Sequence, residues 1–219
     1  MKKTRLKADG ILLDLDGTLV DSKRAYLEAV RTALASTGRK TLDINIVTEI
    51  PKRIEQNLPI DDMLAGIDAS KFLRIYLDAY YNATMVETKP FPDISETLEK
   101  LSHKAKLALV TMRHVPKHKV VEELERLGLA RYFHSVVTAL DTAHPKPSPE
   151  ALLQCASHMA VKINDCIIVG DSITDIQAGK SAGTATVGVL SGIYTRSELE
   201  KEKPDLILES VNLLLDFLE

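Results

Sequence analysis

Short apolar runs alternate with longer amphipathic segments along most of this chain of 219 residues. Each apolar run ends in turn or polar residues, which is typical of strands that are buried on both faces. We therefore predict strands at residues 11–13, 106–111, 135–138, 166–170, 184–190 and 206–208. Helical segments separate most of these strands, so right-handed crossovers should join them into a mostly parallel sheet with helices on both faces.

One block of the chain departs from this alternation. Residues 21–88 carry apolar residues at helical spacing and contain no good strand. Within this block, Pro51 should break or kink a helix. A proline-rich segment then leads the chain back into the alternating pattern. We interpret residues 21–88 as an all-helical cap domain inserted into an α/β core of residues 1–20 and 89–219.

The first predicted strand runs directly into two carboxylates. Asp14 would lie at the carboxyl end of the strand, where open α/β sheets bind ligands, and Asp16 follows two residues later. Two acids this close repel each other unless a cation or a shared proton separates them. Gly17 allows the backbone to turn sharply and to approach a bound group closely. A plainer interpretation is a strand that ends in an Asx turn.

Three more predicted strands lead to polar side chains at the same edge of the sheet. Thr111 ends the second strand, Lys146 lies in the loop after the third, Asp171 follows the fourth, and Asp175 comes one helical turn later. Each has an ordinary structural explanation when taken alone: a turn former, a solvated lysine, a helix cap and an exposed helix residue. Their joint occurrence beside strand ends argues against coincidence.

These carboxylates suit phosphoryl transfer, which needs an in-line nucleophile, charge neutralisation and positioning. Asp14 can attack phosphorus and form an aspartyl phosphate. Asp16 can protonate the leaving oxygen and then activate water for the second step. Mg²⁺ prefers hard oxygen ligands. We predict a Mg²⁺ site made by Asp14, Asp16 (through its backbone carbonyl), Asp171 and Asp175.

The remaining polar groups at this edge are candidates for substrate binding. The Thr111 hydroxyl and the Lys146 ammonium can hold phosphoryl oxygens and assist catalysis. Backbone amides that follow Gly17 offer an additional anion nest.

Composition and charge narrow the class of protein. A formal net charge of −3 with 28 basic residues gives no nucleic-acid footprint. No apolar stretch is long enough to span a membrane, and Asp14 interrupts the N-terminal apolar run that a secretory signal would need. Cys155 and Cys166 resemble small core residues of a reducing compartment. We expect a cytoplasmic monomer or homodimer whose partner is a small phosphorylated metabolite.

The sequence resembles the haloacid-dehalogenase-like (HAD) phosphatase superfamily. The first family motif is matched by DLDGTLVDS at residues 14–22, the second by Thr111, the third by Lys146 in KPSPE, and the fourth by GDSITD at residues 170–175. The resemblance covers nearly the whole chain. It implies a Rossmann-like doubly wound core, a helical cap between the first two motifs, and Mg²⁺-dependent hydrolysis of phosphate monoesters. The phosphoglycolate-phosphatase-like group looks like the closest branch.

The second motif departs from the family pattern. Members with this cap usually carry Asn or Gly after the Thr or Ser, whereas this chain has Met112 followed by Arg113. Arg113 is a candidate contact to a second anionic group of the substrate, or else a solvated loop arginine. In the predicted cap, Arg53 is a candidate contact to the non-phosphate end of the substrate, with an ordinary surface charge as the alternative.

Two other functions fit the same fold. Sugar phosphomutases of the family carry a His just beyond the first motif, where this chain has Tyr26. A non-catalytic binding module typically loses a motif acid, and all of the motif acids are present here. We therefore predict a Mg²⁺-dependent enzyme that hydrolyses a small, phosphoglycolate-like phosphate monoester.

Overall fold

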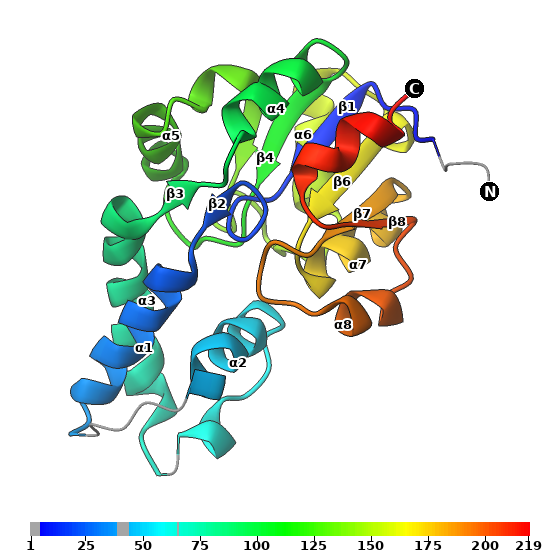
Figure 1. The fold of residues 1–219 in the computed structure, drawn as a ribbon. Coiled ribbons are helices and arrows are strands. Elements are labelled where there is room, and N and C mark those ends of the chain that lie inside the picture. The colour runs from blue at the N-terminus through cyan, green and yellow to red at the C-terminus, as the bar shows by residue number, and fades with distance from the viewer. Residues whose placement is uncertain (1–4, 39–43, 65) are drawn as a thin grey trace. The chain divides into compact units, whose positions relative to one another are not determined.

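The computed structural model describes residues 5–38, 44–64 and 66–219. Its contacts divide the chain into two compact units: Met1–Val20 with Pro90–Glu219, called the α/β unit below, and Asp21–Lys89, called the helical unit. Two short strands, β2 (Val20–Asp21) and β3 (Lys89–Pro90), pair where the chain passes from one unit to the other (Figure 1).

The α/β unit is built on one six-stranded sheet, and every strand pair in it is parallel. In spatial order its strands are β5 (Phe133–Val137), β4 (Lys106–Val110), β1 (Gly10–Leu13), β6 (Cys166–Gly170), β7 (Ala185–Val189) and β8 (Leu206–Leu208). The predicted parallel α/β fold is therefore confirmed.

Helices lie between the strands of this unit, and a short 3₁₀ helix follows the last strand. They are α4 (Ile94–Ser102), α5 (Lys117–Arg126), α6 (Glu150–Met159), α7 (Ile173–Ala182) and α8 (Arg196–Lys201), with short 3₁₀ helices η2 (Ala130–Tyr132), η3 (Ile163–Asp165) and η4 (Val211–Phe217). In the part of the chain that the structure describes, no helix has the length and the apolar character needed to cross a membrane.

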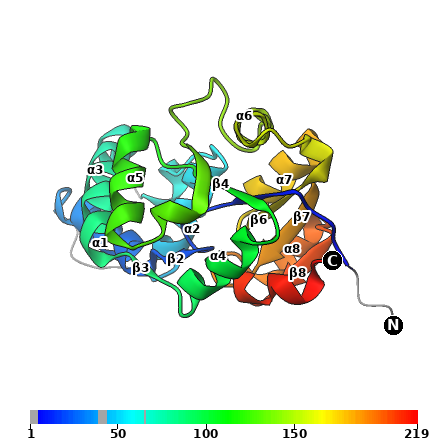
Figure 2. The same ribbon diagram turned by 90° about the horizontal axis from the view of Figure 1, so that it is seen from above.

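The central strand β1 is apolar throughout because helices cover both of its faces. Ile11 and Leu13 belong to the core cluster that includes residues of α4 and α5, whereas Leu12 belongs to the cluster that includes α6. Figure 2 shows α6 and α7 on one side of the sheet and α4 on the other. Alternate residues of the strand thus enter opposite cores.

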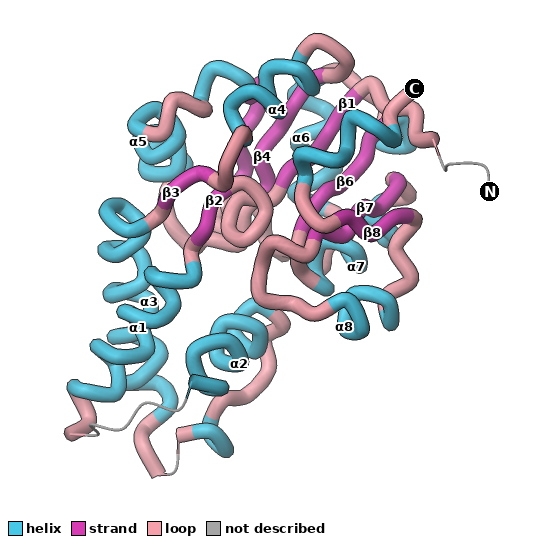
Figure 3. Tube along the Cα trace, viewed as in Figure 1, coloured by secondary structure: helices cyan, strands magenta, loops and turns pink. Residues whose placement is uncertain are grey.

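The helical unit contains α1 (Lys23–Ala35), α2 (Ile44–Glu55), η1 (Asp61–Met63) and α3 (Ala69–Glu87). It has no strand in its described residues apart from its ends in β2 and β3 (Figure 3). Apolar residues of α1 and α3 share one core cluster with α2. Tyr26 stacks on Tyr80 with ring centroids 5.1 Å apart and planes 5° from parallel. Tyr26 therefore contributes to the packing of this unit.

One local prediction is wrong in part. Pro51 does not break a helix, because α2 continues through it to Glu55. A kink at Pro51 stays a prediction. Pro51 removes one backbone hydrogen bond, but Val47 and Ile50 are buried in the helical core, and this burial keeps the helix intact.

Helix α4 begins without a capping box. Glu96 follows Asp93 at the capping-box spacing, but Asp93 has a left-handed backbone (φ 60°) and makes no side-chain cap bond. The capping boxes described in this structure lie at Ser172 with Asp175, and at Thr195 with Glu198. An acceptor side chain with the right spacing caps a helix only when its backbone is extended.

Both cysteines are predicted to resist alkylation in the folded protein. Burial raises the pKa of the Cys155 thiol to about 12 and that of Cys166 to about 11. At pH 8 both thiols therefore stay protonated, and only the thiolate reacts. Iodoacetamide should leave the native protein unmodified by intact mass, and should label both residues after unfolding in urea. Labelling of the native protein at the rate of a free thiol would contradict this expectation.

Candidate active site

Three aspartates meet at the carboxyl edge of the sheet. Asp14 directly follows β1, Asp171 directly follows β6, and Asp175 lies in the first turn of α7. Because β1 and β6 are paired neighbours, with Leu13 opposite Val169, their ends lie side by side. One carboxylate oxygen of each aspartate lies within 4.8 Å of the others, and all three residues are buried.

Lys146 lies between two of these carboxylates. Its Nζ donates hydrogen bonds to Asp14 Oδ1 at 2.8 Å, to Asp175 Oδ1 at 2.6 Å and to the Val110 carbonyl at 3.2 Å. Burial raises the pKa of Asp14 well above its usual range, Lys146 opposes this rise, and Asp175 adds to it. Three carboxyl groups share one ammonium in a desolvated place, which favours the binding of a further cation.

Asp175 is fixed at both of its oxygens. Oδ1 accepts from Lys146, and Oδ2 accepts from the Ser172 backbone N–H at 3.2 Å. The Ser172 hydroxyl in turn accepts from the Asp175 N–H, which completes the capping box of α7. Ser172, and not Asp171, is therefore the N-cap of this helix, which leaves Asp171 to the carboxylate group.

Asp171 is enclosed by two loops of the α/β unit. Thr18 Oγ1 donates to Asp171 Oδ1 at 3.4 Å, and the Ile193 N–H donates to Oδ2 at 3.3 Å. A Cβ at Gly17 would lie 2.6 Å from Asp171 Oδ2, and a Cβ at Gly192 would overlap this side chain. Only glycine permits so close a backbone approach, and Gly17 also has a φ of +80°. The loop around Gly192 was not singled out from the sequence.

The side chain of Asp16 pairs with Arg113. Arg113 also pairs with Glu123 of α5, so one guanidinium joins two carboxylates. The sequence analysis did not single out Glu123. Its position in the pattern could have done so, because Glu123 falls on the apolar face of α5 beside Val120 and Leu124. A charged residue on a buried face needs a partner of opposite charge.

Thr111 lies at a strand end, as the sequence predicts, and Arg53 lies on a helix of the helical unit. Thr111 follows β4, its N–H donates to the Val137 carbonyl, and its buried hydroxyl accepts from the Arg113 N–H at 3.3 Å. Arg53 lies on α2 and pairs with Asp62 at 2.5 Å and with Glu49 at 3.2 Å. Substrate contacts by Thr111, Arg113 and Arg53 remain predictions.

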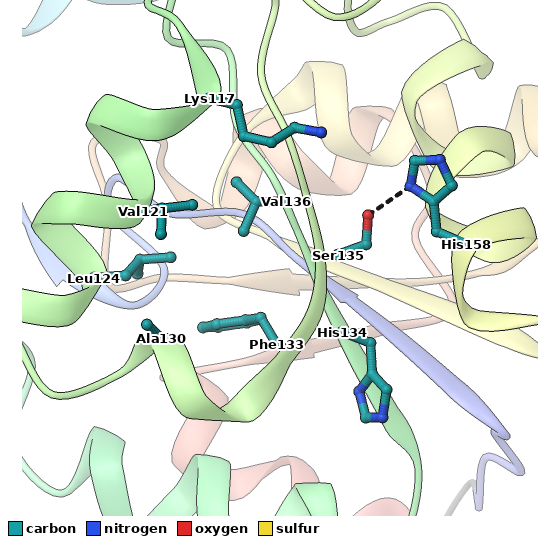
Figure 4. Close-up of a pocket in the computed structure, with 9 residues that line it drawn as sticks. All are labelled: Lys117, Val121, Leu124, Ala130, Phe133, His134, Ser135, Val136 and His158. Atoms are coloured by element: carbon teal, nitrogen blue, oxygen red, sulfur yellow. Dashed lines mark hydrogen bonds between the residues drawn. The ribbon is translucent and has the colours of Figure 1, made fainter.

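A separate pocket of about 320 Å³ opens beside the edge strand β5 (Figure 4). It is lined by Lys117, Val121, Leu124, Ala130, Phe133, His134, Ser135, Val136 and His158. Two of its polar side chains are joined by a hydrogen bond of 2.9 Å between Ser135 Oγ and His158 Nδ1. None of the clustered aspartates lines this pocket, so the candidate active site lies elsewhere.

A parallel sheet that carries buried carboxylates and a lysine at its carboxyl edge has these groups where α/β enzymes place their active sites. A family model described as haloacid dehalogenase-like hydrolase matches residues 11–189. The chain belongs to this family of hydrolases, as the motifs at Asp14 and Asp171 predicted.

Curated relatives agree with this assignment, and a solved structure shares the fold. The chain is 33% identical over 230 aligned positions to proteins named phosphoglycolate phosphatase from Shigella boydii and from Escherichia coli K12, covering 94% of this chain and 90% of each relative. A haloacid dehalogenase-like family hydrolase from Streptococcus pneumoniae shares the fold with a TM-score of 0.80. It is 21% identical, and the match covers 96% of this chain and 98% of that one.

Proposed function

We propose that the protein is a Mg²⁺-dependent phosphatase that hydrolyses a small phosphate monoester through an aspartyl phosphate on Asp14. The observation that carries this proposal is the pairing of Asp14 with Lys146 inside a buried group of three aspartates. A carboxylate held there by a single cation, with a second acid two residues away at Asp16, suits a nucleophile in phosphoryl transfer.

The residues at this edge fit Mg²⁺. Asp14, Asp171 and Asp175 supply hard carboxylate oxygens within 4.8 Å of one another. Lys146 supplies one positive charge against these three carboxylates. These aspartates, together with the Asp16 backbone carbonyl, would hold the ion. When bound, Mg²⁺ neutralises charge on the phosphoryl group.

The side chains at this site have separate roles in the two steps of the proposed reaction. An oxygen of Asp14 attacks phosphorus, and the bond between phosphorus and the ester oxygen breaks. Asp16 gives its proton to that leaving oxygen, so an alcohol departs and Asp14 carries the phosphoryl group. Water then attacks phosphorus, Asp16 takes its proton, and orthophosphate leaves Asp14. Lys146 and the Thr111 hydroxyl hold phosphoryl oxygens during both steps.

The relatives named phosphoglycolate phosphatase support a small phosphorylated organic acid as the substrate. In this proposal the helical unit acts as the cap, and Arg53 reaches the end of the substrate that carries no phosphate. We further propose that the enzyme acts in the cytoplasm as a monomer or homodimer, without nucleic-acid or membrane partners.

A panel assay tests the proposal. Phosphate release would be measured from 2-phosphoglycolate, sugar phosphates and nucleotides, with Mg²⁺, with a chelator, and with Asp14→Asn as the blank. Release that needs Mg²⁺ and disappears in the variant is the expected result. A folded protein that releases no phosphate from any compound would contradict it. Interconversion of sugar phosphate isomers without net release would identify a mutase instead.

Gly192→Ala should weaken the response to Mg²⁺. Its methyl group would overlap the Asp171 side chain, so the carboxylate must move. We expect the Mg²⁺ concentration for half-maximal phosphate release to rise by about 10-fold or more, as for other disturbed metal sites. Gly188→Ala is the matched control, since the atoms nearest to its methyl group would belong to the apolar side chains of Leu199, at 3.2 Å, and Ile207, at 3.6 Å. Equal Mg²⁺ titrations for the two variants would refute this effect.

A further inference from the structure

The side chain of Asp16 is held by a chain of charged groups that ends on helix α5. Arg113 Nε donates to Asp16 Oδ2 and Arg113 Nη2 donates to Asp16 Oδ1, each at 2.7 Å. The Arg113 Nη1 donates to Glu123 Oε2, and Nη2 also reaches Glu123 Oε1 at 3.4 Å. Asp16 is therefore held at both oxygens by a guanidinium that is anchored on its far side by Glu123.

The burial of these charged side chains costs desolvation free energy. The side chains of Arg113 and Glu123 are only 4% and 1% exposed, against 12% for Asp16. Burial raises the pKa of Glu123, and the nearby Arg113 opposes that rise. A buried ion pair contributes little net stability compared with apolar residues of similar volume. The position of Glu123 between core residues of α5 thus points to a role other than stability.

We propose that Glu123 and Arg113 are positioning residues, which set the orientation of the Asp16 carboxylate for proton transfer. This proposal rests on the phosphatase function proposed above. A planar guanidinium that makes two parallel hydrogen bonds permits one orientation of the carboxylate. During proton transfer one Asp16 oxygen exchanges its hydrogen bond to Arg113 for the leaving oxygen, while the other oxygen keeps its bond to Arg113 and so keeps the orientation. Glu123 holds Arg113 in place during this exchange.

This role differs from a substrate contact in its kinetic signature. If Arg113 bound a second anionic group of the substrate, its loss would mainly raise KM. Loss of positioning should instead lower kcat, because the misplaced acid affects the transition state and not ground-state binding. Glu123 separates the two roles best, since the hydrogen bonds that link it to Asp16 run through Arg113.

The test compares Glu123→Gln with Glu122→Gln on the best alkyl phosphate of the panel. Glu122 neighbours Glu123 on α5 but makes an exposed pair with Lys119, which makes it a matched control. We expect Glu123→Gln to lower kcat by about 10- to 100-fold, the usual effect of a small misplacement at a reacting centre. KM should stay within about twofold. Glu122→Gln should behave as the wild type.

A second readout depends on the leaving group. Departure of p-nitrophenolate needs no proton, so its pre-steady-state release from p-nitrophenyl phosphate should be as fast in Glu123→Gln as in the wild type. Glu123→Gln removes the charge that compensates the buried Arg113, and an uncompensated buried charge destabilises a fold. The double variant Arg113→Met with Glu123→Leu controls for this effect. It removes both charges together and should show the same loss of kcat on the alkyl phosphate.

The outcomes are distinct. Unchanged kcat in both variants, or a rise of KM alone, would overturn the positioning role while leaving the phosphatase function intact. An equal slowing of p-nitrophenolate release would also overturn it, because a general structural defect affects both substrates. Wild-type protein that releases no phosphate from any compound would overturn the phosphatase function, and the role of Asp16 with it.

Discussion

Asp14→Asn is expected to abolish turnover and to leave the protein folded. An amide is a poor nucleophile, so the aspartyl phosphate cannot form, and we expect kcat to fall by about 10⁴-fold or more. The fold should survive because asparagine has nearly the same shape. Lys146 also keeps Asp175 as an ion-pair partner at 2.6 Å. Phosphate release and the urea unfolding midpoint would be measured on the same preparation.

Asp165→Asn is the matched control for this experiment. Asp165 is exposed and lies in η3, so its substitution should change neither quantity. Phosphate release by Asp14→Asn at a rate near that of the wild type would exclude Asp14 as the nucleophile. A loss of activity that accompanies unfolding would also count against the expected result, since the variant should be folded.

Lys146→Met should cost both stability and activity. The ammonium lies between Asp14 and Asp175, and the Lys146 side chain is 1% exposed. Its removal leaves two buried carboxylates without their cation, and breaking such a pair typically costs about 3–5 kcal/mol of unfolding free energy. Loss of one preorganised charge at the phosphoryl group should lower kcat by about 10²–10³-fold.

Urea denaturation with and without Mg²⁺ separates these two effects. In our proposal the ion binds the same carboxylates, so added Mg²⁺ should restore part of the stability of Lys146→Met but not its kcat. Lys162→Met, at an exposed position before η3, is the control and should match the wild type. An unchanged urea midpoint and an unchanged kcat in Lys146→Met would contradict the role given to this lysine.

Much of the fold and of the acidic group was predictable from the sequence. Apolar runs that end at Asp14 and Asp171 indicate buried strands, and parallel strands bring their carboxyl ends to one edge of a sheet. Asp175 follows Asp171 by about one helical turn, so a helix that begins between them brings both carboxylates together. These are local patterns combined with one topological rule, so a single sequence carries them.

Other features depend on contacts between distant segments. The pairing of Asp16 with Arg113 and Glu123 joins a strand end, a loop and the inner face of a helix, and no spacing rule connects them. The fit of Gly192 against Asp171 arises from the path of a loop in space. Likewise, Pro51 stays helical because tertiary packing outweighs the local propensity that its residue type expresses.

The position of β1 at the middle of the sheet has a dynamic consequence. This strand is paired on both sides, with β4 and with β6, so its amide hydrogens should exchange with solvent deuterium only in global unfolding. Lys146 lies in a loop outside helices and strands, where local opening suffices for exchange. We thus expect Asp14 to stand next to a strand that exchanges only in global unfolding, while the positive charge that faces it comes from a loop whose amides should exchange faster.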